Sequence, residues 1–408
     1  MRVLFCVQRY GAQIVGGGES LCREVALHLS SIHEVSVATS CATDYRTWEN
    51  TLSPGASIDE GCTVHRFPVR KPRDTVSFDA MTRSLLRGSQ TLADQIAWMQ
   101  AQGPDMPALT DWLTAQQDDF DVVVFFTAEY AHAHFGVPAV TRRPVILQPL
   151  AHDTPYLRLQ TSIQLLEHVR YHVYNTPEER ALVASICTNR PEKFATIGVG
   201  IQPVTSTDLP WPDAVVPAGT PYLLYVGRFD ESKGCMELLR HFQEYLRRHP
   251  QSPLHLVFAG PGTELGTPTP RIHFLGRVDA VTKASLFRHS MVNIVPSPFE
   301  SLSMTALEGW MHERPLLANG RCAVLTGQAV RSNGGLTYDS ADTFMGAVDW
   351  LVNHPSERTR MGICGRAYVE ANYGWPHITH NWNDFLADCV DNWHSTIKTT
   401  SKTGTHMI

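Results

Sequence analysis

The chain has 408 residues, which is too long for one ordinary hydrophobic core and suits two domains. Hydrophobic residues make up 43% and charged residues 18%, which is the balance of a globular protein. The formal net charge of −6 argues against a protein that grips nucleic acid over its whole surface.

The nine cysteines are scattered and none forms a C-x-x-C pair, so we expect neither a zinc site nor a disulfide framework. Residues 1–7 lead directly into an apolar run, and we expect no signal peptide. No segment reaches the roughly 18 uninterrupted apolar residues that a membrane span needs. We therefore expect a cytoplasmic protein that meets a membrane, if at all, peripherally at its inner face.

The N-terminal half alternates apolar runs with helical patterns. Val3–Val7 predicts a buried strand, a glycine run follows at 16–18, and residues 19–30 predict a helix. Residues 80–117 predict irregular helices. Further strands are predicted at 35–38, 122–126, 145–148, 173–175 and 195–199. This order predicts a parallel sheet with covering helices, in a Rossmann-like domain over residues 1–203.

Residues 202–221 are rich in proline and predict a linker, after which the alternation restarts. Helices are predicted at 236–248 and 304–313, and strands at 222–226, 254–259, 272–275, 291–295 and 316–317. The fold class is therefore α/β, with a second Rossmann-like domain at 204–375 and a central cleft between two doubly wound domains. Residues 394–408 are polar, and we expect a disordered tail there.

A glycine-bounded segment follows the strand at 222–226. Gly227 permits a tight turn, and Arg228 and Lys233 then direct two cations toward the carboxyl edge of the sheet. Such a pair can neutralise a diphosphate leaving group in place of a metal. Taken alone, the pattern fits a basic surface turn equally well.

A second segment, Pro298–Ser303, precedes the predicted helix at 304–313. The backbone N–H groups at Leu302 and Ser303 suit a phosphate. Glu300 lies before the helix, where it can meet a sugar, and Glu308 lies inside it, where it can accept two ribose hydroxyls. The alternative is an acidic helix start followed by a solvated glutamate, which the apolar neighbours of Glu308 weaken.

Two further loops carry weaker patterns. Gly260 and Gly262 follow the strand at 254–259, and Arg277 and Val278 follow the strand at 272–275. Their backbone groups suit a nucleotide, but plain turns after a strand explain them as well.

The order of these segments, G-R-F-x-x-x-K-G, G-P-G, F-L-G-R-V and P-S-P-F-E-S-L-S-M-T-A-L-E, resembles family 4 of the retaining glycosyltransferases, which have the GT-B fold. Glu300 and Glu308 match the E-x7-E motif of that family. The resemblance extends to about residue 390 through Gly-Gly-Gly-Glu-Ser, His152 and Tyr373-Gly374-Trp375. Gly309 after Glu308 departs from the usual Glu-Ala, which affects the expected sugar preference rather than the reaction class.

The resemblance implies roles for individual residues. Arg228 and Lys233 bind the donor diphosphate, Glu300 the donor sugar and Glu308 the ribose. The remaining donor-binding residues are Gly17, Gly18, Gly227, Gly260, Gly262, Arg277, Val278, Leu302 and Ser303. His152 faces the reacting sugar, although a solvent-facing loop histidine is the simpler interpretation of this residue alone. The resemblance also implies that the first domain, residues 1–203, binds the acceptor and that a last helix at about 376–392 completes it.

Two local patterns concern a metal and a membrane. Asp119-Phe120-Asp121 is a D-x-D pattern, but it precedes a strand and so lies at the amino end of the sheet. We expect a turn there, no metal and no cofactor. A cluster of cations suits a phosphorylated or lipid-linked acceptor or an anionic membrane, and equally a solvated loop: Arg66, Arg70, Lys71 and Arg73.

The expected function is a metal-independent, retaining hexosyltransferase that moves a sugar from a UDP- or GDP-sugar to a glycan or lipid-linked acceptor, in polysaccharide or glycoconjugate biosynthesis. A nucleotide-sugar epimerase or a non-catalytic nucleotide-sugar-binding protein remains an alternative. A nicotinamide oxidoreductase is disfavoured, because residues 16–18 lack the G-x-G-x-x-G spacing.

Overall fold

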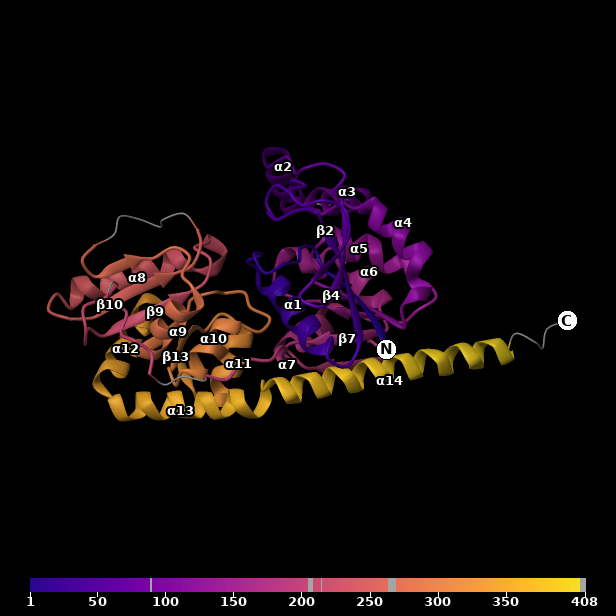
Figure 1. Ribbon diagram of the computed structural model, residues 1–408. Coiled ribbons are helices and arrows are strands. Elements are labelled where there is room, and N and C mark those ends of the chain that lie inside the picture. Colours follow the sequence, from indigo (N-terminus) through magenta and orange to yellow (C-terminus); the bar gives the residue numbers. More distant parts are fainter. Residues whose placement is uncertain (89, 205–207, 214, 263–268, 404–408) are drawn as a thin grey trace. The chain divides into compact units, whose positions relative to one another are not determined.

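The computed structural model describes residues 1–88, 90–204, 208–213, 215–262 and 269–403, with side chains as far as residue 397. The chain forms two compact units (Figure 1). Unit 1 contains Met1–Gly200 and the C-terminal segment that begins at Trp375, and unit 2 contains Ile201–Gly374. Each unit is an α/β structure built on one sheet.

The sheet of unit 1 has eight strands in the order β3-β4-β2-β1-β5-β6-β7-β8. Only β3 runs antiparallel to its neighbour. The carboxyl ends of the parallel strands therefore share one edge. The strands are β1 (Arg2–Cys6), β2 (Glu34–Ser40), β3 (Gly55–Asp59), β4 (Cys62–Phe67), β5 (Val122–Phe126), β6 (Val145–Gln148), β7 (Tyr171–Tyr174) and β8 (Lys193–Thr196).

Helices connect these strands, and several begin with a side-chain cap that satisfies free backbone N–H groups. Thr91 and Asp94 form a reciprocal capping box at the start of α3, and Thr176 caps α7. The helices are α1 (Gly17–Leu29), α2 (Thr75–Arg87), α3 (Leu92–Gln102), α4 (Pro107–Gln116), α5 (Ala131–Gly136), α6 (Gln160–His168), α7 (Pro177–Ile186) and α14 (Trp375–Thr403). Short 3₁₀ turns are η1 (Gln117–Asp119), η2 (Val137–Ala139) and η3 (Pro155–Arg158).

The sheet of unit 2 has six parallel strands in the order β11-β10-β9-β12-β13-β14. The strands are β9 (Tyr222–Val226), β10 (His255–Ala259), β11 (Ile272–Phe274), β12 (Val292–Val295), β13 (Leu316–Asn319) and β14 (Gly335–Tyr338). The helices are η4 (Glu231–Lys233), α8 (Cys235–Arg248), α9 (Ala280–His289), α10 (Met304–Met311), α11 (Ala323–Ser332), α12 (Ala341–Asn353) and α13 (Pro355–Asn372).

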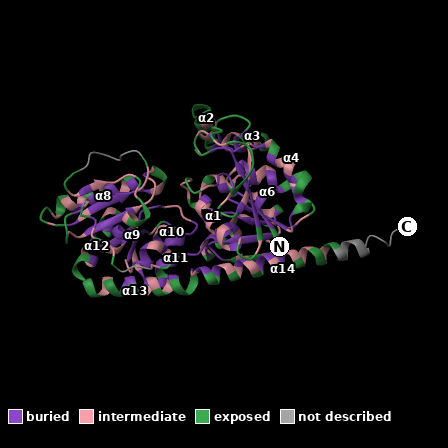
Figure 2. Ribbon diagram, viewed as in Figure 1, coloured by how far each residue is buried: buried purple, intermediate pink, exposed green. Residues whose placement is uncertain are grey.

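The apolar runs of the sequence become the buried strands of both sheets (Figure 2). All five residues of β5 are fully buried, as parallel strands covered on both faces must be. Helix α8 instead buries Leu238, Phe242 and Tyr245 at helical spacing and turns its charged residues outward. Burial of each large apolar side chain contributes about 1.5–3 kcal/mol, so this pattern holds the sheets and their helices together.

The expectation of a disordered tail at 394–408 is wrong for residues 394–403, which continue α14 as helix. Residues 404–408 lie outside the described part of the chain. No glycine or proline interrupts the sequence between residues 377 and 403, so helical hydrogen bonding continues beyond the predicted end at 392. The Arg170 guanidinium donates to the Thr396 hydroxyl at 3.2 Å, which gives this polar segment a partner in unit 1.

The first half of helix α14 packs against the rest of unit 1 through two tryptophans. Trp382 is fully buried, with its ring 6.3 Å from the rings of both Phe5 and Phe126. Trp375 stacks on His28 of α1 at 3.4 Å. A Cβ at Gly200 would lie 2.2 Å from the Trp375 ring, so only glycine fits there. Among the described residues, no helix combines the length and the apolar character needed to cross a bilayer.

Candidate functional site

The loops after β9 and β10 in unit 2 are joined by their backbones. The Gly227 N–H donates to the Ala259 carbonyl at 2.9 Å, and the Phe229 N–H donates to the Pro261 carbonyl at 2.8 Å. Gly260 has a φ of +145°, and a Cβ there would lie 1.9 Å from the Gly227 carbonyl oxygen. Glycine at 260 therefore allows the two loops to touch, which is a structural requirement independent of any ligand.

The loop after β11 contacts the loop after β10. The Gly260 N–H donates to the Gly276 carbonyl at 2.7 Å, so the segment that carries Arg277 and Val278 lies beside the first two loops. The side chain of Arg277 is exposed, while Val278 packs against a small apolar cluster of unit 2. Four of the predicted residues, Gly227, Gly260, Arg277 and Val278, therefore belong to one group of adjoining loops.

Lys233 and Glu300, predicted from separate motifs, meet directly. Their side chains form an ion pair with 2.7 Å between Nζ and Oε1, although the residues lie 67 positions apart. Lys233 ends η4 after strand β9, whereas Glu300 lies in the loop between β12 and α10. The carboxyl ends of two adjacent parallel strands bring them together, as such sheets do for residues that bind ligands.

Arg228 lies in the same loop as Lys233. Its Nη1 is 3.8 Å from Oδ2 of Asp230, a residue that sequence analysis did not single out. Burial alone would raise the pKa of the Asp230 carboxyl, but hydrogen bonds from Ser232 and the charges of Arg228 and Lys233 outweigh it and lower that pKa. Asp230 is thus an anion that interacts with Arg228 and Lys233, the two residues predicted to bind the diphosphate.

The start of α10 has the geometry expected of a helix end that is open to an anion. Ser303 precedes the helix with a φ of +70°, and its side chain makes no capping hydrogen bond. The hydrogen bonds found among the described residues leave the N–H groups of Leu302 and Ser303 without a protein acceptor. The Leu302 carbonyl accepts a hydrogen bond from the buried side chain of Gln328, which fixes this turn.

Glu308 on α10 pairs with Lys283 on α9, with 2.8 Å between Oε1 and Nζ. Both side chains are partly exposed. Sequence analysis missed Lys283, because nothing in a helical pattern indicates that one exposed lysine faces a glutamate 25 residues later. The predicted ribose ligand is therefore a carboxylate already oriented by a neighbouring cation.

In unit 1 the two predicted glycines lie in the first turn of α1 rather than in a free loop. A Cβ at Gly18 would lie 2.8 Å from Leu150 Cδ1 and 2.9 Å from Thr127 Oγ1. Nothing lies within 4 Å of a Cβ built at Gly17. Gly18 thus allows α1 to approach the loops after β5 and β6, while Gly17 faces open space.

His152 lies in the loop after β6 and is partly exposed. The Glu179 carboxyl group accepts a hydrogen bond from this loop, and sequence analysis missed this residue. The Ala151 N–H donates to Glu179 Oε1 at 2.7 Å, and the Asn175 N–H donates to Oε2 at 2.6 Å. A signal was present, because Thr176 and Glu179 have the spacing of a capping box.

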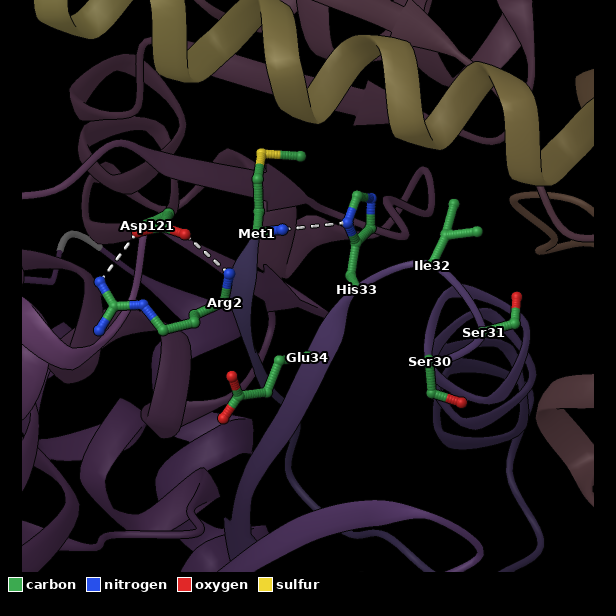
Figure 3. A pocket seen from close by; sticks show the side chains of 8 residues that line it. All are labelled: Met1, Arg2, Ser30, Ser31, Ile32, His33, Glu34 and Asp121. Carbon is green, nitrogen blue, oxygen red and sulfur yellow. Dashed lines mark hydrogen bonds and ion pairs between the residues drawn. The ribbon is translucent and has the colours of Figure 1, made fainter.

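A surface pocket of unit 1 lies at the opposite, amino edge of its sheet (Figure 3). Met1, His33 and Asp121 directly precede β1, β2 and β5. Asp121 accepts from the Arg2 backbone N–H at 2.7 Å and from its guanidinium at 2.9 Å. The D-x-D pattern is thus at the amino end of β5, where sequence analysis placed it, and Asp121 is bound to Arg2.

The predicted cluster of four cations separates into two pairs. Arg66 donates to Ser57 at 2.7 Å, and Arg73 donates to the Ala101 carbonyl at 3.2 Å with its guanidinium 4.4 Å from the Phe78 ring centre. These two side chains stabilise unit 1 internally. Arg70 and Lys71 are exposed, although Arg70 also lies 3.3 Å from Asp105.

The segment of unit 2 that contains these loops resembles known proteins. Residues 220–354 match the family described as glycosyl transferases group 1. D-inositol 3-phosphate glycosyltransferase from Corynebacterium diphtheriae is 26% identical over 249 residues, which are 56% of this chain and 58% of that protein. The chain spans 56–60% of the length of this and two similar curated relatives.

Solved structures of other proteins can be superposed on nearly the whole chain. Sucrose-phosphate synthase from Thermosynechococcus elongatus has a TM-score of 0.69 at 15% identity, over 95% of this chain and 98% of that one. Anabaena HepE in complex with UDP and glucose has a TM-score of 0.68 at 12% identity, over 95% and 100%. The predicted fold class is thus confirmed: the chain has the GT-B fold, and its residues 220–354 match the glycosyl transferases group 1 model.

Proposed function

We propose that this protein is a metal-independent, retaining glycosyltransferase of the hexosyltransferase type, with a UDP- or GDP-sugar as donor. The observation that carries the proposal is the meeting of Lys233 and Glu300 at 2.7 Å, beside Arg228, within the segment that matches glycosyl transferases group 1. A cation for the diphosphate and a carboxylate for the sugar are the two groups that a nucleotide-sugar site requires next to each other.

Unit 2 supplies the donor site in this proposal. Arg228 and Lys233 neutralise the diphosphate, and the N–H groups of Leu302 and Ser303 donate to a phosphate oxygen. Glu308 accepts the ribose hydroxyls while Lys283 holds its carboxylate in place at 2.8 Å. The base lies against the backbone of Arg277 and Val278. Gly260 and Gly262 keep these loops close enough to act on one molecule.

In the proposed reaction, the sugar passes from the diphosphate to a hydroxyl group of the acceptor with retention of its anomeric configuration. The acceptor hydroxyl oxygen attacks the anomeric carbon on the face from which the diphosphate leaves, and the bond between that carbon and the phosphate oxygen breaks. The hydroxyl proton passes to the departing phosphate oxygen, whose negative charge Arg228 and Lys233 stabilise. Glu300 holds the sugar hydroxyls, and His152 from unit 1 donates a hydrogen bond to the reacting sugar.

The acceptor is proposed to be a glycan or a lipid-linked sugar, in polysaccharide or glycoconjugate biosynthesis. A relative named D-inositol 3-phosphate glycosyltransferase supports an acceptor rich in hydroxyl groups. All nine cysteines are free thiols, which supports a reducing, cytoplasmic location. A peripheral contact with an anionic membrane would use Arg70 and Lys71, because Arg66 and Arg73 have partners inside unit 1.

A thermal-shift panel of UDP, GDP and ADP tests the donor class first. We expect one diphosphate to raise the melting temperature in the absence of any divalent cation, and its sugar conjugate to be hydrolysed slowly with release of that diphosphate. The anomeric configuration of a transferred product should match the donor. Binding without release of the diphosphate would identify a non-catalytic protein, and conversion of the donor sugar without an acceptor would identify an epimerase.

A further inference from the structure

The loop that carries His152 includes a residue in an unusual backbone conformation. Leu150 has a φ of +51°, a left-handed conformation that a leucine adopts only when its surroundings impose it. Leu150 and Ala151 are both buried, so the N–H groups of this turn must find acceptors inside the protein. Something outside the loop therefore fixes it.

Glu179 is the group that does so. Its side chain, on the first turn of α7, is 1% exposed. One carboxyl oxygen accepts from Ala151 in the loop after β6, and the other accepts from Asn175 in the loop after β7. A single carboxyl group thus joins two neighbouring loops at the carboxyl edge of the sheet.

Other contacts orient Glu179 in turn. The Glu179 N–H donates to the Thr176 hydroxyl at 3.2 Å, which sets the first turn of the helix. The Asn175 side chain accepts from Gln148 at 2.8 Å, so the ends of β6 and β7 are also joined by a second hydrogen bond. A carboxyl group this deeply buried is costly to keep, because it loses its hydration. We therefore attribute the burial of Glu179 to its role in joining the loops after β6 and β7, and not only to a contribution to stability.

We propose that Glu179 is a positioning residue for His152: it fixes the loop of His152 through the Ala151 N–H, while the Asn175 N–H anchors the other carboxyl oxygen. This inference rests on the proposed function, in which His152 contacts the reacting sugar. Glu179 itself touches no substrate. It acts by keeping the loop in one conformation, so that the imidazole is in place before the sugar arrives.

Three variants separate this role from a purely structural one. Glu179→Gln keeps the volume but offers only one acceptor oxygen, and Glu179→Ala removes both. Glu167→Gln is the matched control: that carboxylate also accepts two backbone N–H groups, from Thr188 at 2.5 Å and Asn189 at 3.1 Å, but outside the loop that carries His152. All rates are measured at least 15 °C below each variant's melting temperature, with folding checked by circular dichroism.

Release of UDP from UDP-glucose and of GDP from GDP-mannose provides the kinetic readout. We expect Glu179→Gln to lower kcat about tenfold and Glu179→Ala further, with the Kd for the free diphosphate unchanged because unit 2 binds it. Glu167→Gln should change neither. The decisive comparison is the double variant: combined with His152→Ala, Glu179→Gln should slow the reaction no further. A full additional tenfold loss in that background, or a normal kcat in Glu179→Gln alone, overturns the proposal.

Hydrogen exchange tests the same claim without any assumption about the reaction. Peptides that cover residues 149–153 should exchange faster in Glu179→Gln than in the wild type, and Glu167→Gln should leave them unchanged. Unchanged exchange there overturns the role of Glu179 even if the enzyme is active. If the wild type hydrolyses neither sugar nucleotide while the exchange difference appears, the proposed function fails and the structural part of this inference stands.

Discussion

The ammonium group of Lys233 lies 2.7 Å from Oε1 of Glu300. The pair is only partly exposed, so each charge depends on the other while no ligand is bound. A diphosphate would offer Lys233 a stronger partner and leave Glu300 with free acceptor oxygens for sugar hydroxyls. The proposed donor site would thereby couple binding of the diphosphate to orientation of the sugar through one ion pair.

The first prediction is that Lys233→Ala weakens diphosphate binding. Loss of a charge-assisted hydrogen bond costs about 1.5–3 kcal/mol, so the Kd for UDP or GDP should rise roughly 10- to 150-fold. Isothermal titration calorimetry measures it directly. Arg247→Ala is the control, because that guanidinium is exposed on α8 and pairs with Glu244. Equal affinity in the wild type and in Lys233→Ala would contradict the proposed donor site.

The second prediction concerns Glu308 and its partner. Glu308→Gln should raise the Kd for UDP or GDP about tenfold, because a carboxylate that accepts from ribose hydroxyls is replaced by a weaker acceptor. The loss should be smaller with dUDP or dGDP, which lack the 2′-hydroxyl. Lys283→Met should weaken binding in the same direction but less, since it releases the carboxylate without removing it. An equal loss for ribose and deoxyribose ligands would argue against ribose recognition.

Apolar runs predicted much of the fold. Residues 145–148 were expected as a strand and are β6, and the helix expected at 236–248 is α8 with one further residue. The pair β3 and β4 was missed. All of β3 except its last residue is exposed, so it lies at the edge of the sheet without the apolar pattern that identifies a buried strand.

The site was predictable where chemistry is carried by a local motif, and not where it depends on packing. Arg228, Lys233 and Glu300 lie in loops that follow predicted strands. Glu179 contacts Ala151, 28 positions away, and Lys283 contacts Glu308, 25 positions away. Contacts between such distant positions cannot be recognised from the periodicity of a single sequence. The helical segment at 394–403 was missed for a related reason, because its polarity resembles that of a tail.

The third prediction separates the structural and functional roles of Gly17. A Cβ at this position meets nothing within 4 Å, and the residue begins a helix, so Gly17→Ala should not lower stability. If Gly17 approaches the donor phosphate, however, a methyl group there should lower the rate of diphosphate release severalfold. Gly346→Ala, in α12 of unit 2, is the control that should stabilise by about 0.5–1 kcal/mol and leave the rate unchanged. Equal rates in both variants would remove Gly17 from the site.

The fourth prediction is a dependence of stability on pH through Glu179. Burial raises the pKa of this carboxyl from 4.5 to about 8, against the opposing effect of its backbone hydrogen bonds. The folded protein thus holds the proton more tightly than the unfolded chain. The resulting stabilisation is complete below pH 4.5 and is lost as the pH rises through 8.

Glu179→Gln carries no proton at this position, so it isolates the effect. The difference in unfolding free energy between the wild type and this variant should shift against the wild type by up to a few kcal/mol between pH 5 and pH 9. Urea denaturation at each pH measures it. The hydroxyl of Tyr174 is an ionisable group that interacts with this carboxyl, and its raised pKa keeps it neutral over this range. A constant difference across the range would show that Glu179 does not change its protonation.

The fifth prediction tests whether α14 is part of the fold of unit 1. Trp382 is fully buried between Phe5 and Phe126, so Trp382→Ala should lower the free energy of unfolding by about 3–5 kcal/mol. His380→Ala, exposed on the same helix, should change it by less than about 0.5 kcal/mol. Because unit 2 carries the proposed diphosphate ligands, Trp382→Ala should still bind UDP or GDP with normal affinity below its melting temperature. Equal stability in the two variants would mean that α14 contributes no packing energy to the sheet of unit 1.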